Sequence, residues 1–92
     1  MAVPFKAPVK DITFGYEVID SYNILNKISE FSDFSEDIVI PTMEECAKFS
    51  EEVLAPINAI GDQQGATIDN GVVKMPQEFV DAYKKFAEAG WA

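Results

Sequence analysis

The chain has 92 residues, of which 48% are hydrophobic and 25% charged, a composition typical of one small globular domain and not of a disordered segment. Sixteen acidic residues face seven lysines, and the resulting net charge of −9 argues against nucleic acid or an anionic membrane surface as a partner. There is no histidine and no arginine, so the chain lacks the usual general base, the commonest zinc ligand and the side chain that grips phosphate bidentately.

The single cysteine and the N-terminus give no sign of an oxidising compartment. Cys46 has no partner for an internal disulfide, and it falls on the apolar stripe of an expected helix, so we expect an inert thiol in the core. The first six residues have no basic region followed by an apolar one, as a secretory signal would. No apolar run approaches the roughly 20 residues that span a bilayer. These features predict a cytoplasmic location.

The first third of the chain is expected to hold an extended lead and one or two helices. Residues 1–10 contain two prolines and no periodicity, so they should be extended. Asp11 suits the N-cap of a helix over about 12–29. Because Asp20 and Ser21 compete for backbone hydrogen bonds, two shorter helices broken there fit the sequence as well as one.

The longest expected helix covers about 36–60. It begins either at Ser35, which two acidic residues follow, or at Thr42, which opens a capping box, and helix is expected on both sides of Pro41. Pro56 lies inside the pattern, where it removes a ladder hydrogen bond and bends the helix at a cost of roughly 3 kcal/mol. Such a cost is tolerated where packing requires the bend, so this helix should pack against something larger than itself.

Gly61 is expected to end the long helix, and a β-hairpin is expected to follow at about 66–75. Asn70 and Gly71 supply the two positive-φ positions of a type I′ turn, with β-branched residues on either side. A two-stranded hairpin alone is marginal in water, so this one should pack on another element.

The last expected helix covers about 76–89. Pro76 suits its first position, Gly90 suits the left-handed position after its end, and Trp91 would then contact Phe86 in a Schellman motif. Taken alone, a tryptophan at such a terminus would be exposed, so we expect the chain to be the beginning of a larger domain. The fold class predicted is mainly α, with three to four helices and a small hairpin forming part of a helical domain.

Acidic pairs on the long helix do not make a catalytic or metal site. A di-metal carboxylate centre needs a histidine beside its glutamates, and there is none. The pairs Glu44-Glu45 and Glu51-Glu52 are better explained as a solvated helix face, with Lys48 four residues after Glu44. The sequence therefore predicts no catalytic, cofactor-binding or metal-ligating residue.

Two further sites are rejected on their residue patterns. The segment 62–69 has acids and glycines but lacks oxygen ligands where a calcium loop needs them. Acyl carrier proteins are acidic, helical and of this size, and attach their prosthetic group to the serine of an Asp-Ser-Leu motif. Here Tyr22 replaces the leucine after Asp20 and Ser21, and too little chain precedes the pair for a full first helix.

Several stretches of the sequence occur in the order found in one enzyme family. They are Ala47–Gly65, then outward Ala7–Asp11, Phe14 and Glu17-Val18, and Asn70–Val73, Pro76, Phe79, Ala82-Tyr83 and Glu88–Trp91. With these stretches the chain resembles the acyl-CoA dehydrogenases, in the subfamily that carries an extra N-terminal segment. The resemblance covers nearly the whole chain, but none of its elements is a catalytic signature.

The resemblance implies that residues 1–34 are the N-terminal extension and residues 35–92 the truncated beginning of the N-terminal helical domain. It implies a homo-oligomeric parent flavoenzyme of fatty acid β-oxidation that oxidises acyl-CoA to 2-enoyl-CoA with FAD and an electron-transfer acceptor. The catalytic glutamate and the FAD contacts of the family lie outside these residues, so the fragment itself should be structural. The alternative is a free-standing acidic helical module that binds a partner protein.

Overall fold

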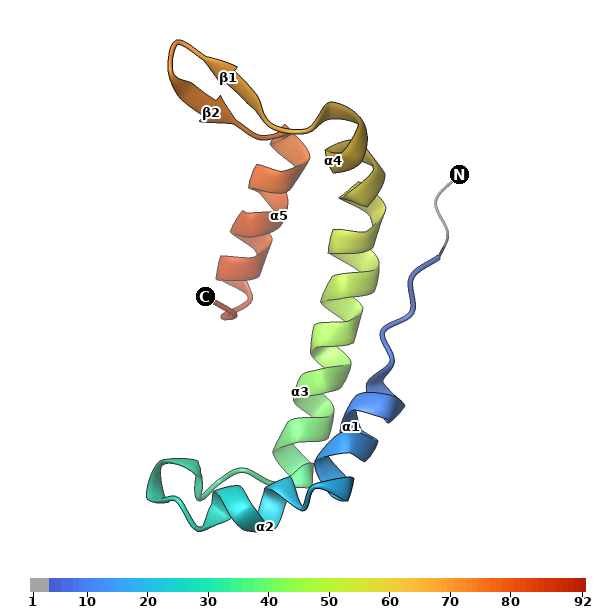
Figure 1. Ribbon diagram of the computed structural model, residues 1–92, viewed down its shortest axis with the longest axis vertical. Helices are drawn as coiled ribbons and strands as arrows, with labels where there is room; N and C mark the ends of the chain where they lie inside the picture. The colour runs from blue at the N-terminus through green and yellow to red at the C-terminus, as the bar shows by residue number, and fades with distance from the viewer. Residues whose placement is uncertain (1–3) are drawn as a thin grey trace. The chain divides into compact units, whose positions relative to one another are not determined.

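The computed structural model describes residues 4–92, which are mainly helical with one small antiparallel hairpin, and the predicted fold class is confirmed (Figure 1). The chain divides into two compact units. The first unit holds residues 6–50, and the second holds residues 51–92 together with Pro4 and Phe5. Each unit is described by itself below.

In the first unit, two helices replace the single helix considered over 12–29. The helices are α1 (Val9–Val18), α2 (Ser21–Asn26), a short 3₁₀ turn (Ser29–Phe31) and α3 (Glu36–Phe49). The break between α1 and α2 falls at Asp20, whose φ of 57° is left-handed. The side-chain amide of Asn23 donates to Asp20 Oδ1 at 2.8 Å and fixes this corner. Asp20 and Ser21, whose side chains compete for backbone hydrogen bonds, therefore interrupt the helix at this point.

Helix α1 begins earlier than the sequence indicated. Pro8 is its N-cap, and the Pro8 carbonyl accepts the N–H of Ile12 at 3.0 Å. The expectation that Asp11 caps the helix is wrong, because Asp11 lies inside the first turn. A proline needs no partner for an amide proton at a helix start, and an acid in the first turn is favoured by the helix dipole.

Of the two possible starts of the long helix, Ser35 is the right one. Ser35 is extended (φ −148°, ψ 164°) and precedes α3, and its carbonyl accepts the N–H groups of Ile38 and Val39. Thr42 lies inside α3, where its hydroxyl donates to the Ile38 carbonyl at 2.7 Å. Helix continues on both sides of Pro41, as expected.

The expected helix over 36–60 is helical throughout but is not an α-helix throughout. After α3 the chain forms a π-helical turn (Ser50–Leu54), a 3₁₀ turn (Ala55–Ile57) and then α4 (Asn58–Gln64). In a regular α-helix, Pro56 would leave the Glu52 carbonyl without its donor, and its ring would crowd that carbonyl. The wider π turn followed by the tighter 3₁₀ turn accommodates the proline without ending the helix.

Gly61 does not end the long helix, contrary to the prediction. Helix α4 runs on to Gln64, and Gly65 ends it with a φ of 63° and an N–H that donates to the Gly61 carbonyl at 2.8 Å. Within α4, Gly61 lies against the ring of Phe79, so closely that a Cβ at position 61 would overlap the ring. Gly61 is therefore a close-approach glycine between α4 and the last helix.

The predicted hairpin is present with the predicted turn. Strands β1 (Thr67–Asp69) and β2 (Val72–Lys74) pair antiparallel, with Ile68 opposite Val73. Asn70 and Gly71 have φ of 51° and 80°, the two positive values that a type I′ turn requires. Every residue of both strands is exposed. The expectation that the hairpin packs on another element is thus not met within the described residues.

The last helix, α5 (Gln77–Glu88), ends in the Schellman motif that the sequence predicts. The N–H of Trp91 donates to the Phe86 carbonyl at 3.2 Å, the N–H of Gly90 donates to the Ala87 carbonyl at 3.1 Å, and Gly90 has a φ of 88°. At the other end of α5, Pro76 is the N-cap and not the first helical residue, so the helix begins at Gln77, one residue later than expected.

The buried core of residues 4–92 is small. Apart from Pro76, only Val39, Ala47 and Ala82 are buried apolar residues, and no large side chain is completely enclosed. Cys46, expected in the core, is exposed. The apolar stripe on which Cys46 lies is wider than the surface that the neighbouring elements cover. The exposed large hydrophobic side chains include Phe14, Val18 and Ile19 in the first unit and Ile68, Val73 and Tyr83 in the second.

The contact between Gly61 and Phe79 predicts that Gly61→Ala destabilises the second unit. The new methyl group overlaps the aromatic ring, and overpacking of this kind costs about 1–3 kcal/mol. Gly15→Ala in α1 is the matched control, because nothing lies within 4 Å of its added methyl group. That change should stabilise the first unit by about 0.5–1 kcal/mol. Urea unfolding followed by circular dichroism measures both, and equal stabilisation by the two alanines would contradict the close contact.

The irregular helical segment predicts a local effect of Pro56→Ala. Restoring an amide proton at position 56 allows a bond to the Glu52 carbonyl, so the π and 3₁₀ turns should become α-helix and the helix content should rise. Cα chemical shifts across Ser50–Ile57 report this change. Pro41→Ala, which removes a proline already held in α geometry, should leave those shifts unaltered. Persistence of the π turn in Pro56→Ala would show that packing holds it instead.

Candidate functional site

Three aromatic rings form the centre of the first unit. Tyr16 in α1 and Phe34 before α3 meet edge to face with ring centroids 6.0 Å apart. Tyr22 in α2 lies 5.3 Å from Phe34 and 6.2 Å from Tyr16. Pairs at such distances each contribute about 0.5–1.5 kcal/mol beyond area burial. The cluster therefore holds the end of α1, α2 and the start of α3 together. Phe31, three residues before Phe34, is half exposed.

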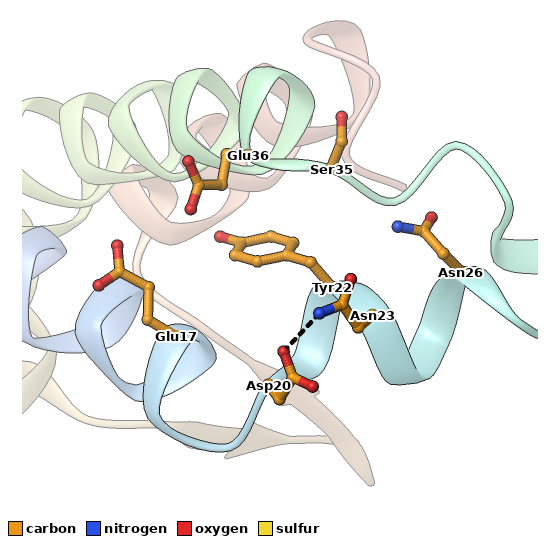
Figure 2. A pocket seen from close by; sticks show the side chains of 7 residues that line it. All are labelled: Glu17, Asp20, Tyr22, Asn23, Asn26, Ser35 and Glu36. Atoms are coloured by element: carbon orange, nitrogen blue, oxygen red, sulfur yellow. Dashed lines mark hydrogen bonds between the residues drawn. The ribbon is translucent and has the colours of Figure 1, made fainter.

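Beside this cluster lies an open surface cavity of about 380 Å³. Figure 2 shows the hydroxyl of Tyr22 directed to the space between the carboxylates of Glu17 and Glu36. Three elements contribute to the cavity: the end of α1, helix α2 and the start of α3. Its lining comprises Glu17, Asp20, Tyr22, Asn23, Asn26, Ser35 and Glu36.

The hydroxyl of Tyr22 is buried and has no hydrogen-bond partner within the described residues. Burial raises the pKa of the Tyr22 phenol above its ordinary value, and the negative charges of Glu36 and Glu17, with a smaller effect of Tyr16, raise that pKa further. A phenol that keeps its proton more firmly is a poorer base and nucleophile near neutral pH. Tyr22 is therefore poorly suited to act as a base or nucleophile.

The cavity is unsuited to a flavin dinucleotide. Three of its seven lining residues are carboxylates, and no lysine lines it. The diphosphate of such a cofactor needs cationic side chains or a helix N-terminus whose backbone N–H groups are free to bind it. The lining carboxylates would instead repel it. The described residues thus do not fit FAD at this site.

One of the acidic residues weighed in the sequence forms an ion pair on the surface of α3. Lys48 pairs with Glu45 at 3.6 Å, and not with Glu44 as predicted. Both partners are exposed, so the pair contributes little to stability. Within residues 4–92 no group of three or more potential ligands is placed to hold a metal ion.

The burial of Ser21 also argues against the acyl carrier alternative. Ser21, the residue that would carry the prosthetic group, is only 6% exposed at the start of α2. A serine must be accessible to be modified by another enzyme.

No helix in the described part of the chain is long and apolar enough to cross a membrane.

The sequence did not indicate the cavity. Asp20 and Ser21 were recognised as a break, which sets the corner between α1 and α2, but nothing in the local pattern places Glu17 and Glu36 near Tyr22. That arrangement depends on aromatic packing between residues far apart in the chain, which a local sequence pattern does not encode.

The raised pKa of Tyr22 predicts a pH-dependent stability that Tyr22→Phe removes. The folded chain keeps this proton to a higher pH than the unfolded chain. The contribution is therefore fully present below about pH 10, the ordinary tyrosine pKa, and is lost as pH rises through the folded value. Urea midpoints of the wild type and Tyr22→Phe, measured from neutral to alkaline pH, should diverge in that range. Tyr83→Phe, which leaves Tyr22 in place, should follow the wild type. Parallel curves for Tyr22→Phe and the wild type would contradict the assignment.

Comparison with known proteins points to one enzyme. No protein-family model and no solved structure matches the chain. The chain is 33% identical over 87 residues to 3-methylmercaptopropionyl-CoA dehydrogenase of Ruegeria pomeroyi. The match covers 95% of this chain but only 15% of the length of that relative. The resemblance of this chain to the acyl-CoA dehydrogenases is thereby confirmed along nearly its whole length.

Proposed function

We propose that the chain is the N-terminal part of an FAD-dependent acyl-CoA dehydrogenase. The observation that carries this proposal is the 33% identity to a CoA-thioester dehydrogenase across nearly the whole chain. Residues 1–34 form the N-terminal extension, and residues 35–92 begin the N-terminal helical domain. The matched segment is 15% of the relative, so most of the parent enzyme lies in other residues.

The parent enzyme oxidises an acyl-CoA thioester to the 2-enoyl-CoA and passes the electrons through FAD to an acceptor. The name of the relative specifies an acyl-CoA thioester, which supports the substrate class. The family relationship also carries the expectations of a homo-oligomer and of a cytoplasmic location.

Within the parent, these residues are structural. The cavity beside Tyr22 is lined by carboxylates that disfavour a dinucleotide, and the raised pKa of Tyr22 makes it a poor base or nucleophile. They offer instead apolar side chains without cover, such as Tyr83 on α5 at 66% exposed and Phe14 on α1 at 63%. Side chains of this kind mark surfaces that other protein elements cover.

The second candidate, a free-standing acidic module that binds a partner protein, is supported by the same exposed side chains together with the net charge of −9. The two candidates differ in the stability of the isolated chain. A free-standing module should be a monodisperse monomer that melts cooperatively. A piece of a larger domain should instead bind ANS and unfold over a broad range rather than in a sharp transition, because its apolar surface is uncovered.

The proposed function is tested with the 92-residue chain and with the product of the full reading frame. The DNA that follows the codon for Ala92 should continue the frame into a dehydrogenase of about the relative's size. That full-length product should be yellow and should reduce an electron-acceptor dye with an acyl-CoA, whereas the 92-residue chain should be colourless and inactive. A stop codon directly after Ala92 would contradict the proposal. So would FAD bound by the short chain, or dye reduction by it that is lost in Glu44→Gln, Glu45→Gln, Glu51→Gln or Glu52→Gln.

A further inference from the structure

The tip of the β1–β2 hairpin is the most open piece of backbone in the second unit. Asn70 and Gly71 are exposed, and nothing lies within 4 Å of the position a Gly71 Cβ would take. The Asn70 side chain makes no hydrogen bond within residues 4–92, and the Gly71 N–H donates to no backbone carbonyl there. An unbonded side-chain amide thus stands next to an unbonded and unshielded backbone nitrogen.

An asparagine side chain next to an unhindered backbone nitrogen can undergo a well-known intramolecular reaction. The deprotonated backbone nitrogen of the following residue attacks the side-chain carbonyl carbon. A bond forms between that nitrogen and Cγ, the bond between Cγ and Nδ2 breaks, and ammonia leaves with the proton. Water then opens the cyclic imide at either carbonyl and gives aspartate or isoaspartate. The net reaction consumes one water and releases one ammonia, with no oxidation or reduction.

We propose that Asn70 is a site of spontaneous deamidation in the folded protein. Glycine in the following position is the most permissive residue for the attack, because it has no Cβ to hinder the approach to Cγ. The left-handed φ of 51° at Asn70 and the turn bonds must relax before the ring can close. The strands that hold the turn have only three residues each and are exposed throughout, so this local opening costs little.

The other asparagines provide a comparison within the same chain. Asn23 lies in α2, where its side-chain amide already donates to Asp20 at 2.8 Å, and a branched isoleucine follows it. Asn26 and Asn58 lie at a helix end and a helix start, before a lysine and an alanine. Each of these neighbours carries a Cβ, and the helical backbone keeps its nitrogen away from the side-chain carbonyl. Deamidation is therefore confined to Asn70.

The isoaspartate product would undo the hairpin. Isoaspartate adds a carbon to the main chain, and a two-residue turn with a fixed register cannot absorb it. Aspartate keeps a turn-forming Asp-Gly pair and changes the hairpin less, by placing a second carboxylate next to Asp69, whose own charge is already paired with Lys74 at 3.4 Å. Loss of the turn would release the exposed strands from their pairing, so ageing of the protein at Asn70 changes the structure between α4 and α5.

The test follows the purified chain in mildly alkaline buffer by mass spectrometry. Trypsin cleavage after Lys48 and Lys74 releases one peptide that contains both Asn58 and Asn70, so one is an internal control for the other. A synthetic peptide of residues 66–75, incubated in parallel, gives the rate without a folded hairpin. We expect the mass change of amide to carboxyl at Asn70 alone, at a rate within about tenfold of the peptide and rising with hydroxide concentration.

Two variants locate the chemistry. Asn70→Gly keeps a turn-forming pair and should abolish the mass change in that tryptic peptide. Gly71→Ala adds a Cβ beside the attacking nitrogen and should slow the reaction in the chain and in the peptide alike. A rate in the folded chain more than about tenfold below the peptide would overturn the proposal, because the hairpin would then protect the site. A mass change that persists in Asn70→Gly would overturn it as well, and neither result bears on the dehydrogenase assignment.

Discussion

The missing amide proton of Pro56 shapes the middle of this protein. A regular α-helix from Glu36 to Gln64 would need a donor at position 56 for the Glu52 carbonyl, and the chain has none there. The helical path survives because a π turn (Ser50–Leu54) precedes the proline and a 3₁₀ turn (Ala55–Ile57) contains it. Helix α4 then begins afresh at Asn58, which sets the position at which Gly61 meets the ring of Phe79. The close contact between α4 and α5 follows from where the irregularity falls.

A second constraint is the shortage of buried apolar surface. Val39, Ala47, Pro76 and Ala82 are the buried apolar residues of the described chain, and two of the four are alanines, which bury little area. Burial contributes about 25 cal/mol per Å², so these residues supply only a small part of what ordering the backbone costs. Local devices carry much of the remainder: the aromatic cluster in the first unit, and the Schellman motif and type I′ turn in the second.

The features that could be predicted from sequence are those fixed by neighbouring residues. Asn70-Gly71 specifies its turn and Gly90-Trp91 its helix end through the φ values that glycine and asparagine tolerate, and both are confirmed. Gly61 was misread as a helix stop because its reason lies 18 residues away, in Phe79. Cys46 was placed in the core because the stripe alone does not tell how much of it finds a partner. The cavity beside Tyr22 depends in the same way on packing between distant residues.

The proposed role agrees with how charge and apolar surface are divided. Carboxylates line the cavity beside Tyr22, so under the proposed role a flavin diphosphate would be bound by other segments of the parent enzyme. What the chain offers other segments is apolar: Phe14 and Val18 on α1, and Tyr83 on α5. A substitution at these positions would act on the packing of the enzyme and so on its stability. Its effect on the chemical step would be indirect, through the geometry of residues that this chain helps to support.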